Sequence, residues 1–486
     1  MRRSGILLPL FSLPSPYGIG TMGKTAFQFI DFLSECEQYY WQILPTGPTT
    51  YSNSPYQSTS AFAGNPYFID LDELVDMGLI SKKDTEQFAS LQGDTIDYAY
   101  LYRNRRPLIT KAAKELFESA DDYELFKSEN SYWLEDYCFY MVIKEKNNMR
   151  PLAKPIKEYL DVKDNLISET EIQAKIQYLF FQQWKKLKQY ANSKNVHIIG
   201  DIPIYVSHDS SDFFAHRELF YCSEKGELLR KAGCPPDPFS PNGQLWGNPL
   251  YNWNDKKDEC FSWWKERFHQ ASQLFDCVRI DHFRGIYEYY SIPANAENAK
   301  KGEWVKGPGM EFVSMLRESF PNLEIIAEDL GFLTDDTRAF FKESGYRGMK
   351  ILQFAFNDKN SEYLPHNHTP NSVCYTGTHD NPTALSWLCS ASREEINFAL
   401  DYFGVCRISQ LTHCLIMGAL SSVCNTAIIP LQDYMDVGCK GRINTPGTEI
   451  GNWEYRLPED YCTPRLKNRI LHYTKTYSRS NREETQ

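Results

Sequence analysis

Short apolar runs, each closed by polar or charged residues, recur along this chain of 486 residues. Most are separated by segments in which apolar residues follow one another at steps of three and four, the spacing of helices with one buried face. Eight runs have the length and composition of buried strands. The predicted strands are residues 39–45, 66–71, 196–206, 276–283, 323–331, 349–356, 372–381 and 426–434.

Strands that alternate with helices pair in parallel, and eight such units can close a barrel. The sequence therefore predicts an α/β fold, a (β/α)8 TIM barrel with helical insertions between its strands. We expect residues 1–486 to form a single catalytic barrel. Residues 75–175 are rich in helical patterns without a predicted strand, which indicates an inserted subdomain. Residues 207–260 form a second long connection, and we expect this loop region to lie over the active site.

The segment from Cys414 to Leu431 contains 18 residues without a charge. Polar residues interrupt its middle, which favours a helix followed by a buried strand over a membrane span. The chain starts with basic and apolar residues, like a secretion signal. Pro9, Pro14 and Pro16 break that stretch, however, and no small-residue cleavage site follows. We therefore expect neither a signal nor a membrane segment.

The net charge of −11 argues against nucleic acid or an anionic membrane as a partner, because binding to phosphate groups needs a basic surface. A neutral substrate fits this charge better. Aromatic residues make up 14% of the chain, with 31 Tyr and 10 Trp. They are compatible with a sugar-binding groove lined by rings and with a Tyr-rich core, and composition alone favours the core.

Thirteen cysteines are scattered along the chain without a CxxC pair or a spacing typical of metal ligands. This pattern suggests neither a disulfide framework nor a zinc site. Reduced thiols are the simplest interpretation. We therefore expect a cytoplasmic protein without a bound metal.

Carboxylates close four of the predicted strands. Because the working residues of a (β/α)8 barrel lie at the carboxyl ends of its strands, these acids are candidates for one site. They are Asp201, Asp281, Glu328 and Asp380, with Asp433 as a possible fifth. For any one of them alone, a loop carboxylate, a helix N-cap or the partner of an arginine is the better explanation. Four acids on one rim favour glycosidic chemistry, in which one carboxylate attacks the anomeric carbon and a protonated one releases the leaving oxygen.

The neighbours of two acids suggest their roles. Arg279 lies two residues before Asp281 and therefore on the same side of the strand, where its charge should keep Asp281 ionised and nucleophilic. Glu328 follows the apolar residues IIA, an approach that favours a raised pKa and a proton donor.

Longer motifs extend over nearly the whole chain. They are SGILLPLFSLPSPYGIG, WQILPTGPTTYSNSPYQSTSAFAGNPYFIDL, GDIPIYV, PPDPFSPNGQLWGNPLYNW, RIDHFRG, EWVKGPG, IIAEDLG, GMKILQFAF, YTGTHDN, IPLQDY and RINTPGTEIGNW. Through these motifs and their order, the chain resembles the 4-α-glucanotransferases of the amylomaltase type, glycoside hydrolase family 77, which are related to the α-amylase clan.

The resemblance implies roles for individual residues. Asp281 would be the nucleophile, Glu328 the general acid/base, and Asp380 a third carboxylate that binds sugar hydroxyls. The residues implied to bind substrate are Tyr56, Asp201, Asp237, Gln244, Trp246, Arg279, His379 and Asn444.

Among these, Tyr56 would be the aromatic platform under the reacting glucose. Asp237, Gln244 and Trp246 would belong to a loop that closes over the glucan, for which a passive connection is the alternative. For Asp201, a structural role is nearly as well supported as a place in the site.

The implied activity is a retaining double displacement without cofactor or metal, in which an α-1,4-glucan segment passes to the 4-hydroxyl of an acceptor glucose or maltodextrin. The two reacting carboxyls would then lie about 5 to 5.5 Å apart. The residues alone leave open an α-glucan hydrolase, which shares the same acids, and an inactive glucan-binding protein. The oligomeric state is not indicated.

Overall fold

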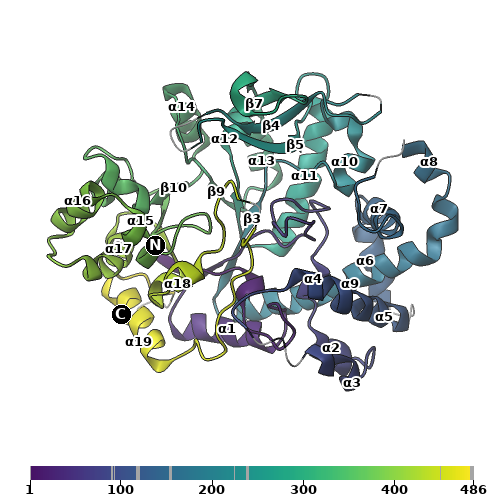
Figure 1. Cartoon of the computed structure of the whole chain (residues 1–486), viewed down its shortest axis with the longest axis horizontal. Helices are drawn as coiled ribbons and strands as arrows, with labels where there is room; N and C mark the ends of the chain where they lie inside the picture. Colours follow the sequence, from purple (N-terminus) through teal and green to yellow (C-terminus); the bar gives the residue numbers. More distant parts are fainter. Residues whose placement is uncertain are drawn as a thin grey trace.

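The computed structural model describes residues 2–88, 91, 93–116, 121–152, 156–223, 225–236, 240–448 and 450–481. Eight parallel strands form one sheet that curls around the centre of the molecule (Figure 1). Their order in the sheet is β10-β11-β12-β1-β2-β3-β6-β9. The strands are β1 (Arg3–Leu7), β2 (Tyr40–Gln42), β3 (His197–Ile202), β6 (Cys277–Ile280), β9 (Glu324–Ala327), β10 (Gly348–Ile351), β11 (Ser372–Tyr375) and β12 (Thr426–Pro430).

The sheet closes on itself between β9 and β10. An isolated parallel bridge joins Ile326 of β9 to Arg347, the residue before β10. In addition, the Ala327 N–H donates to the Arg347 carbonyl at 2.8 Å. These contacts complete a barrel and confirm the predicted (β/α)8 fold class.

Apolar side chains fill the barrel interior. Successive residues of a strand point to opposite sides, so the interior takes alternate positions. On β11, Val373 and Tyr375 belong to the inner cluster, whereas Cys374 packs in the outer one with the helices. The inner cluster comprises Leu7, Tyr40, Ile199, Cys277, Ile326, Met349, Ile351, Val373, Tyr375 and Ile428.

One predicted strand is wrong. Residues 66–71 form the 3-10 turn η2 (Pro66–Phe68) and the start of α2 (Leu71–Asp76). Asp70 accepts a hydrogen bond from the first turn of α2, so helix capping replaces strand pairing here. The barrel strand missing from the prediction is Arg3–Leu7, whose basic and apolar residues resemble the start of a signal sequence.

Helices pack around the outside of the barrel (Figure 1). The helices that follow barrel strands or precede the next one are α1 (Lys24–Glu35), α9 (Ile167–Ser193), α11 (Lys257–Leu274), α12 (Arg284–Tyr287), α13 (Met310–Ser319), α14 (Asp335–Ser344), α15 (Ala384–Ser390), α16 (Arg393–Phe403), α17 (Leu411–Ser421), α18 (Leu431–Tyr434) and α19 (Pro464–Thr476).

The chain between β2 and α9 adds a group of helices on the right of Figure 1. They are α2, α3 (Lys82–Thr85), α4 (Tyr98–Tyr100), α5 (Arg106–Glu115), α6 (Asp121–Glu129), α7 (Leu134–Lys146) and α8 (Ile156–Leu160). The buried faces of α5 and α7 pack against the long helix α9, which connects this group to the barrel.

A second sheet stands at the top of Figure 1 and is antiparallel, with the order β5-β4-β7-β8. Its strands are β4 (Arg230–Cys234), β5 (Gln244–Pro249), β7 (Glu288–Pro293) and β8 (Glu303–Lys306). The sequence does not predict it, because polar residues and glycines interrupt the strand pattern, as in RKAGC of β4. Helix α10 (Ser211–Ala215) lies between β3 and this sheet in the chain.

The apolar segment Cys414–Leu431 is divided between α17 and β12, a helix and a buried strand as predicted. Of the described residues, no single helix has the length and apolar composition to cross a membrane. The pair Arg393–Phe403 and Ile408–Ser421, bent by 66°, meets that test only together.

The two ends of the chain lie side by side (Figure 1). The Arg479 guanidinium donates to the carbonyl of Arg3 at 3.0 Å, and the Ser4 hydroxyl donates to the carbonyl of Arg479 at 3.3 Å. The C-terminal segment therefore covers the start of β1.

The position of β1 predicts an effect of a single methyl group. A Cβ atom on Gly5 would lie 2.5 Å from the Tyr40 Cβ and 2.7 Å from the Ile428 Cδ1. We expect Gly5→Ala to lower the free energy of unfolding by about 1–3 kcal/mol, because two neighbouring strands must move apart. Urea-induced unfolding measures this. Gly438→Ala is the matched control, since nothing lies within 4 Å of its Cβ position; equal losses in both variants would contradict the placement of β1.

Candidate active site

Three strand ends bring one cation and three acids together. Asp201 lies in β3, Arg279 lies opposite it in β6, and Asp281 follows β6 directly. Glu328 follows β9, and its N–H donates to the carbonyl of Ile280 at 3.1 Å. Because parallel neighbours end at the same edge, these residues meet at the carboxyl end of the barrel.

The Arg279 guanidinium binds all three acids. Its Nη1 donates to both Asp201 oxygens at 2.8 and 2.6 Å and to Asp281 Oδ1 at 3.0 Å. Its Nη2 donates to Glu328 Oε2 at 3.1 Å. Arg279 is only 3% exposed and the Asp201 side chain is fully buried. One buried cation thus faces three carboxyls, and all three cannot ionise without an electrostatic cost.

The protonation of Asp281 differs from the expectation. Burial raises its pKa to about 6; Arg279 opposes this shift, whereas Glu328 and Asp380 add to it. Burial likewise raises the pKa of Asp201 to about 6. Arg279 therefore limits a shift that burial causes, rather than holding the pKa of Asp281 below its ordinary value. Asp281 is still ionised at neutral pH.

Glu328 is surrounded by donors rather than by the apolar groups that the sequence suggests. Besides Arg279, the N–H of His282 donates to Glu328 Oε2 at 2.6 Å. His282 has a φ of 49°, in the left-handed region that residues with a Cβ rarely adopt. This turn directly after Asp281 aims the N–H at Glu328, so local backbone strain fixes the two acids beside each other.

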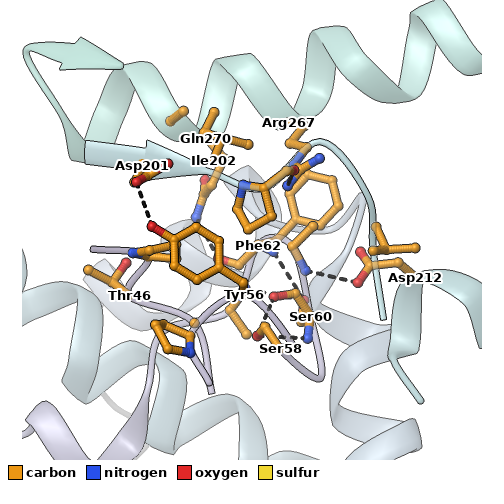
Figure 2. Close-up of a pocket in the computed structure, with 18 of the residues that line it drawn as sticks. Thr46, Tyr56, Ser58, Ser60, Phe62, Asp201, Ile202, Asp212, Arg267 and Gln270 are labelled. Atoms are coloured by element: carbon orange, nitrogen blue, oxygen red, sulfur yellow. Dashed lines mark hydrogen bonds between the residues drawn. The ribbon is translucent and has the colours of Figure 1, made fainter. Parts of the chain in front are cut away.

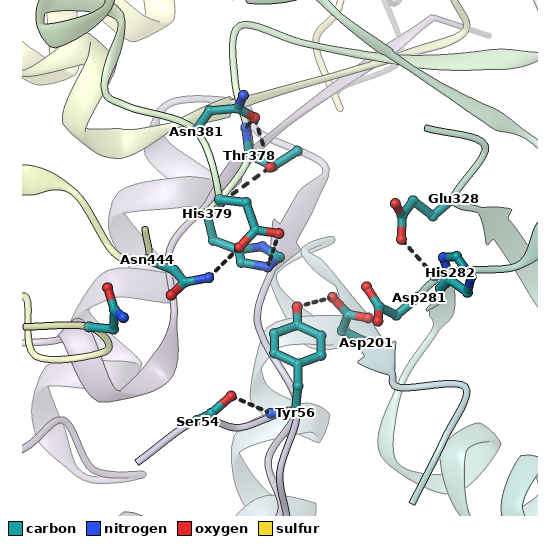
Figure 3. A network of polar contacts seen from close by, with 12 residues as sticks. Ser54, Tyr56, Asp201, Asp281, His282, Glu328, Thr378, His379, Asn381 and Asn444 are labelled. Carbon is teal, nitrogen blue, oxygen red and sulfur yellow. Dashed lines mark hydrogen bonds and ion pairs between the residues drawn. The ribbon is translucent and has the colours of Figure 1, made fainter. Parts of the chain in front are cut away.

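The third acid, Asp380, belongs to the loop after β11. Figure 3 shows its neighbours His379 and Asn381 across Tyr56 from Asp281. Asn444 Nδ2 donates to Asp380 Oδ1 at 2.6 Å, and His379 Nε2 lies 3.3 Å from Asp380 Oδ2. Partial burial opposes ionisation of Asp380, but His379 and Asn444 bring its pKa down to about 2. Asp380 therefore stays charged, with 42% of its side chain exposed to the opening.

Tyr56 lies between Asp201 and Asp281 on one side and His379 and Asn444, the partners of Asp380, on the other (Figure 3). Its hydroxyl donates to Asp201 Oδ2 at 2.8 Å, and its ring stacks on His379 with centroids 5.2 Å apart. Trp453 packs against both rings at 5.8 and 6.0 Å. Tyr56 is partly exposed, whereas His379 and Trp453 are buried behind it, so the Tyr56 ring is the face against which a sugar ring can lie.

Trp453 was not among the predicted site residues. It occurs in the quoted motif RINTPGTEIGNW, but an isolated tryptophan in a glycine-rich loop gives no sign of where it packs. Its φ of 65° turns the chain sharply at that point.

A cavity of about 60 Å³ lies behind Tyr56 (Figure 2). At its far side, Asp212 Oδ2 accepts a hydrogen bond from the Ala61 N–H at 2.8 Å. The Ser60 hydroxyl accepts one from the Phe62 N–H at 3.1 Å. These bonds hold the loop that carries Tyr56 in one conformation, which reduces the ordering that substrate binding requires.

Two of the three predicted loop residues lie on β5. The Trp246 indole N–H donates to Gln244 Oε1 at 3.0 Å. The Trp246 ring packs edge-on against His282, with centroids 4.9 Å apart, so β5 reaches the rim next to Asp281. Asp237 lies outside the described residues.

Asp433, the possible fifth acid, does not join this group. It is buried and accepts hydrogen bonds from the Thr376 hydroxyl at 2.5 Å and from the Ala384 N–H at 2.7 Å. It thereby links the end of β12 to the two ends of the loop that carries Asp380.

Groups that could hold a metal ion lie away from these acids. Within the described parts of the chain, one set of His, Cys, Asp and Glu side chains is compact enough: His368, Cys374 and Cys424. These residues belong to the outer layer of the barrel, between the sheet and the helices.

Fold and site together define a class of protein. A (β/α)8 barrel with paired carboxyls at the carboxyl end of its strands, a third acid that is charged near neutral pH and a partly exposed tyrosine ring is suited to breaking and forming bonds in a neutral, hydroxyl-rich substrate. These are the features of a carbohydrate-active barrel enzyme.

Comparisons with known proteins give the family. A family model described as 4-alpha-glucanotransferase matches residues 8–462. A 4-alpha-glucanotransferase of Streptococcus pneumoniae is 44% identical over 498 residues, which cover 99% of this chain and 98% of the relative. One of Clostridium butyricum is 44% identical over 483 residues, covering 96% and 99%. An amylomaltase structure from Streptococcus agalactiae in complex with acarbose matches with a TM-score of 0.95 at 36% identity, over 99% of this chain and 100% of the other.

This chain therefore belongs to the 4-alpha-glucanotransferase family, which confirms the resemblance found in its motifs.

The opposite pKa shifts of two acids predict opposite effects on stability. The pKa of Asp281 rises from its ordinary value near 3.8 to about 6 in the folded protein, so its ionisation costs stability as the pH rises through this range. We expect Asp281→Asn to stabilise the protein at pH 7, by on the order of 1–3 kcal/mol, and much less at pH 4.

Asp380→Asn is the control for this prediction. The pKa of Asp380 is lowered to about 2, so its ionisation stabilises the fold above pH 4, and Asp380→Asn should lower the melting temperature at pH 7. Thermal unfolding of both variants between pH 4 and 8 tests whether the two substitutions change the melting temperature in opposite directions. A lower melting temperature for Asp281→Asn at pH 7 would contradict the raised pKa.

Proposed function

We propose that this protein transfers segments of α-1,4-glucans to the 4-hydroxyl of glucose or of another glucan, by a retaining double displacement. The observation that carries this proposal is the meeting of Asp281 and Glu328 on one guanidinium at the open end of the barrel. Such a pair supplies both the nucleophile and the proton donor that retaining chemistry needs. Family membership supplies the substrate class.

In the first step, the ionised Asp281 attacks C1 of the glucan while Glu328 gives its proton to the departing oxygen. The bond between C1 and this oxygen breaks, and an ester forms between C1 and Asp281. Asp380, which stays charged, accepts hydrogen bonds from the hydroxyls of the reacting sugar. Tyr56, with His379 stacked on it, supports the apolar face of the sugar ring.

In the second step, Glu328 takes the proton of the acceptor's 4-hydroxyl, and that oxygen attacks C1. The ester breaks and Asp281 leaves as a carboxylate, so the enzyme returns to its initial protonation state. Arg279 positions both carboxyls and compensates the charge that returns to Asp281.

Transfer and hydrolysis differ only in the acceptor. An acceptor sugar held beside the ester competes with water because its hydroxyl is present at high effective concentration. We propose that residues 207–260, which contain Gln244 and Trp246, form the acceptor side, and that residues 75–175 are an inserted subdomain of the same barrel. The hydrolase alternative is not favoured by the family.

The proposal extends to partners and location. Donors would be maltodextrins or the α-1,4 chains of glycogen or starch, with glucose or maltodextrins as acceptors. The thirteen cysteines, free throughout the described residues, fit a reducing compartment such as the cytoplasm.

The activity can be measured with maltotriose alone. A transferase is expected to produce glucose and longer maltodextrins while the number of reducing ends stays constant. Chromatography of the products and a reducing-end assay are run on the same samples. A rise in reducing ends that matches substrate loss would identify a hydrolase, and unchanged maltotriose would identify a binding protein.

The roles of the two carboxyls can be separated with an activated donor. Glu328→Gln should lower transfer from maltotriose by about 10²–10⁴-fold, because the leaving glucan needs a proton. With α-maltosyl fluoride, whose leaving group needs no acid, this variant should accumulate a covalent maltosyl-enzyme. Peptide mass mapping should place the added mass on Asp281. The Asp281→Asn variant is the control and should form no adduct; an adduct on another residue would refute the assignment.

The raised pKa of Asp281 predicts the acid limb of the pH profile. Because only the ionised carboxylate attacks C1, kcat/KM should fall as the pH drops through about 6. Arg279→Gln removes the cation and should move the acid limb of kcat/KM to higher pH. Arg279→Lys retains a cation and is the control for this shift. Asp201 titrates in the same range; Asp201→Asn removes one negative charge beside Arg279, so it should retain the acid limb and move it to lower pH. A limb that vanishes in Asp201→Asn would assign the titration to Asp201 instead.

A further inference from the structure

A histidine and two cysteines meet on the outer side of the barrel. Their potential ligand atoms lie within 4.8 Å of one another. His368 follows the 3-10 turn η9 (Pro365–Asn367), Cys374 is the third residue of β11, and Cys424 lies two residues before β12. All three are buried, with exposed fractions of 7%, 0% and 0%. Three separate chain segments therefore deliver these donors to one closed point.

The donors have the chemistry and spacing of a zinc site. Thiolate and imidazole are the preferred protein ligands of Zn²⁺, with Zn–S near 2.3 Å and Zn–N near 2.0–2.1 Å. Ligands at these lengths around one tetrahedral ion lie about 3.5–3.8 Å apart. The Cys424 sulfur is 3.5 Å from His368 Nδ1. Shifts below about 1 Å would therefore bring all three donors onto one ion.

The second nitrogen of His368 is already held in place. His368 Nε2 lies 2.9 Å from the carbonyl of Tyr363, which can only accept a hydrogen bond. Nε2 therefore carries the proton, and the lone pair of Nδ1 points at the thiols. A ring nitrogen bonded to a backbone carbonyl in this way is a regular feature of metal-bound histidine, because it fixes both the tautomer and the ring.

A buried cation lies near the two thiols. Arg479 is fully buried, and its described hydrogen bonds all go to backbone carbonyls, among them those of Ser422 and Cys424 at 3.0 Å each. A buried cation beside two thiols lowers the cost of forming thiolates. With Zn²⁺, two thiolates and one neutral imidazole give a complex without net charge, which an apolar layer accommodates.

We propose that His368, Cys374 and Cys424 bind one zinc ion, which fastens the segment after η9 to β11 and to the start of β12. The Ser422 hydroxyl is buried in the same layer and lies within hydrogen-bonding reach of both thiols, which makes it the candidate for the fourth ligand. The role is structural, because the site lies on the helix side of β11 and not at the carboxyl end of the barrel. It is independent of the proposed transfer reaction.

Metal content of the whole chain tests this proposal. The protein is produced in zinc-supplemented medium, purified without chelators and analysed by plasma mass spectrometry. We expect close to one zinc per chain in the unchanged protein and at least a tenfold loss in Cys424→Ser. Cys260→Ser is the matched control, since Cys260 is equally buried but belongs to no such cluster, and it should retain the zinc.

A second measurement does not depend on the fold of the cysteine variants. Unfolding and refolding with Cd²⁺ in place of zinc should produce the ultraviolet charge-transfer band of cadmium thiolates. His368→Gln keeps both thiols and should weaken the band and lower the melting temperature of the zinc-loaded protein by several degrees. Transfer activity at 25 °C should stay unchanged in this variant.

Three results would overturn the proposal. The first is a zinc content below a tenth of an ion per chain in the protein without substitutions. A disulfide between Cys374 and Cys424, found by mass spectrometry without reduction, is another. The third is equal zinc content in the unchanged protein and in Cys424→Ser, which would mean that the metal binds elsewhere.

Discussion

The structure of the site depends on one buried guanidinium. Moving a cation such as that of Arg279 out of water costs several kcal/mol, and here three close carboxyls offset that cost. Neighbouring strands β3, β6 and β9 each bring one acid, so the barrel can hold the cation only if these strands end in register. The same contact fixes where Asp281 and Glu328 stand. Because three acids share one positive charge, the excess negative charge and the burial raise the pKa of Asp281 and Asp201 towards neutrality.

The third acid shows what a different environment does to the same chemical group. Asp380 has its own partners, His379 and Asn444, and its pKa falls to about 2 where that of Asp281 rises to about 6. One carboxylate is thus charged at every physiological pH, while the other loses its proton just below neutrality. This difference in pKa allows one acid to bind hydroxyls as a carboxylate, while the others transfer protons or form a covalent bond. Tyr56 connects the acids around Arg279 with the surroundings of Asp380. Its hydroxyl donates to Asp201 and its ring stacks on His379.

The sequence predicts those parts of this arrangement that follow from local periodicity. A carboxylate that ends an apolar run lies at a strand end, so Asp281 and Glu328 could be placed on one rim before any coordinates. Helix capping is harder to recognise in a sequence. Residues 66–71 have the apolar pattern of a strand, although Asp70 caps the start of a helix. The sign of a pKa shift is harder still, because it depends on how deeply the site is buried and on acids that are distant in sequence. The position of the Trp453 ring and the antiparallel sheet are not predicted from the sequence for the same reason. Their partners are set by tertiary contacts and not by the spacing of residues along the chain.

The cysteines extend this reasoning to the outer layer. Metal sites are recognised in sequences when their ligands are close together, whereas Cys374 and Cys424 are 50 residues apart and meet only because β11 and β12 are neighbours in the barrel. The period of two along β11 places Tyr375 inside the barrel and Cys374 under the helices, and the chain then continues to Asp380 at the rim. One short strand thereby contributes to the core, to the outer layer and to the site. An ion on its outer face would hold β11 against β12 without touching the acids, and so would stabilise the support of Asp380 while leaving its charge and its partners unchanged.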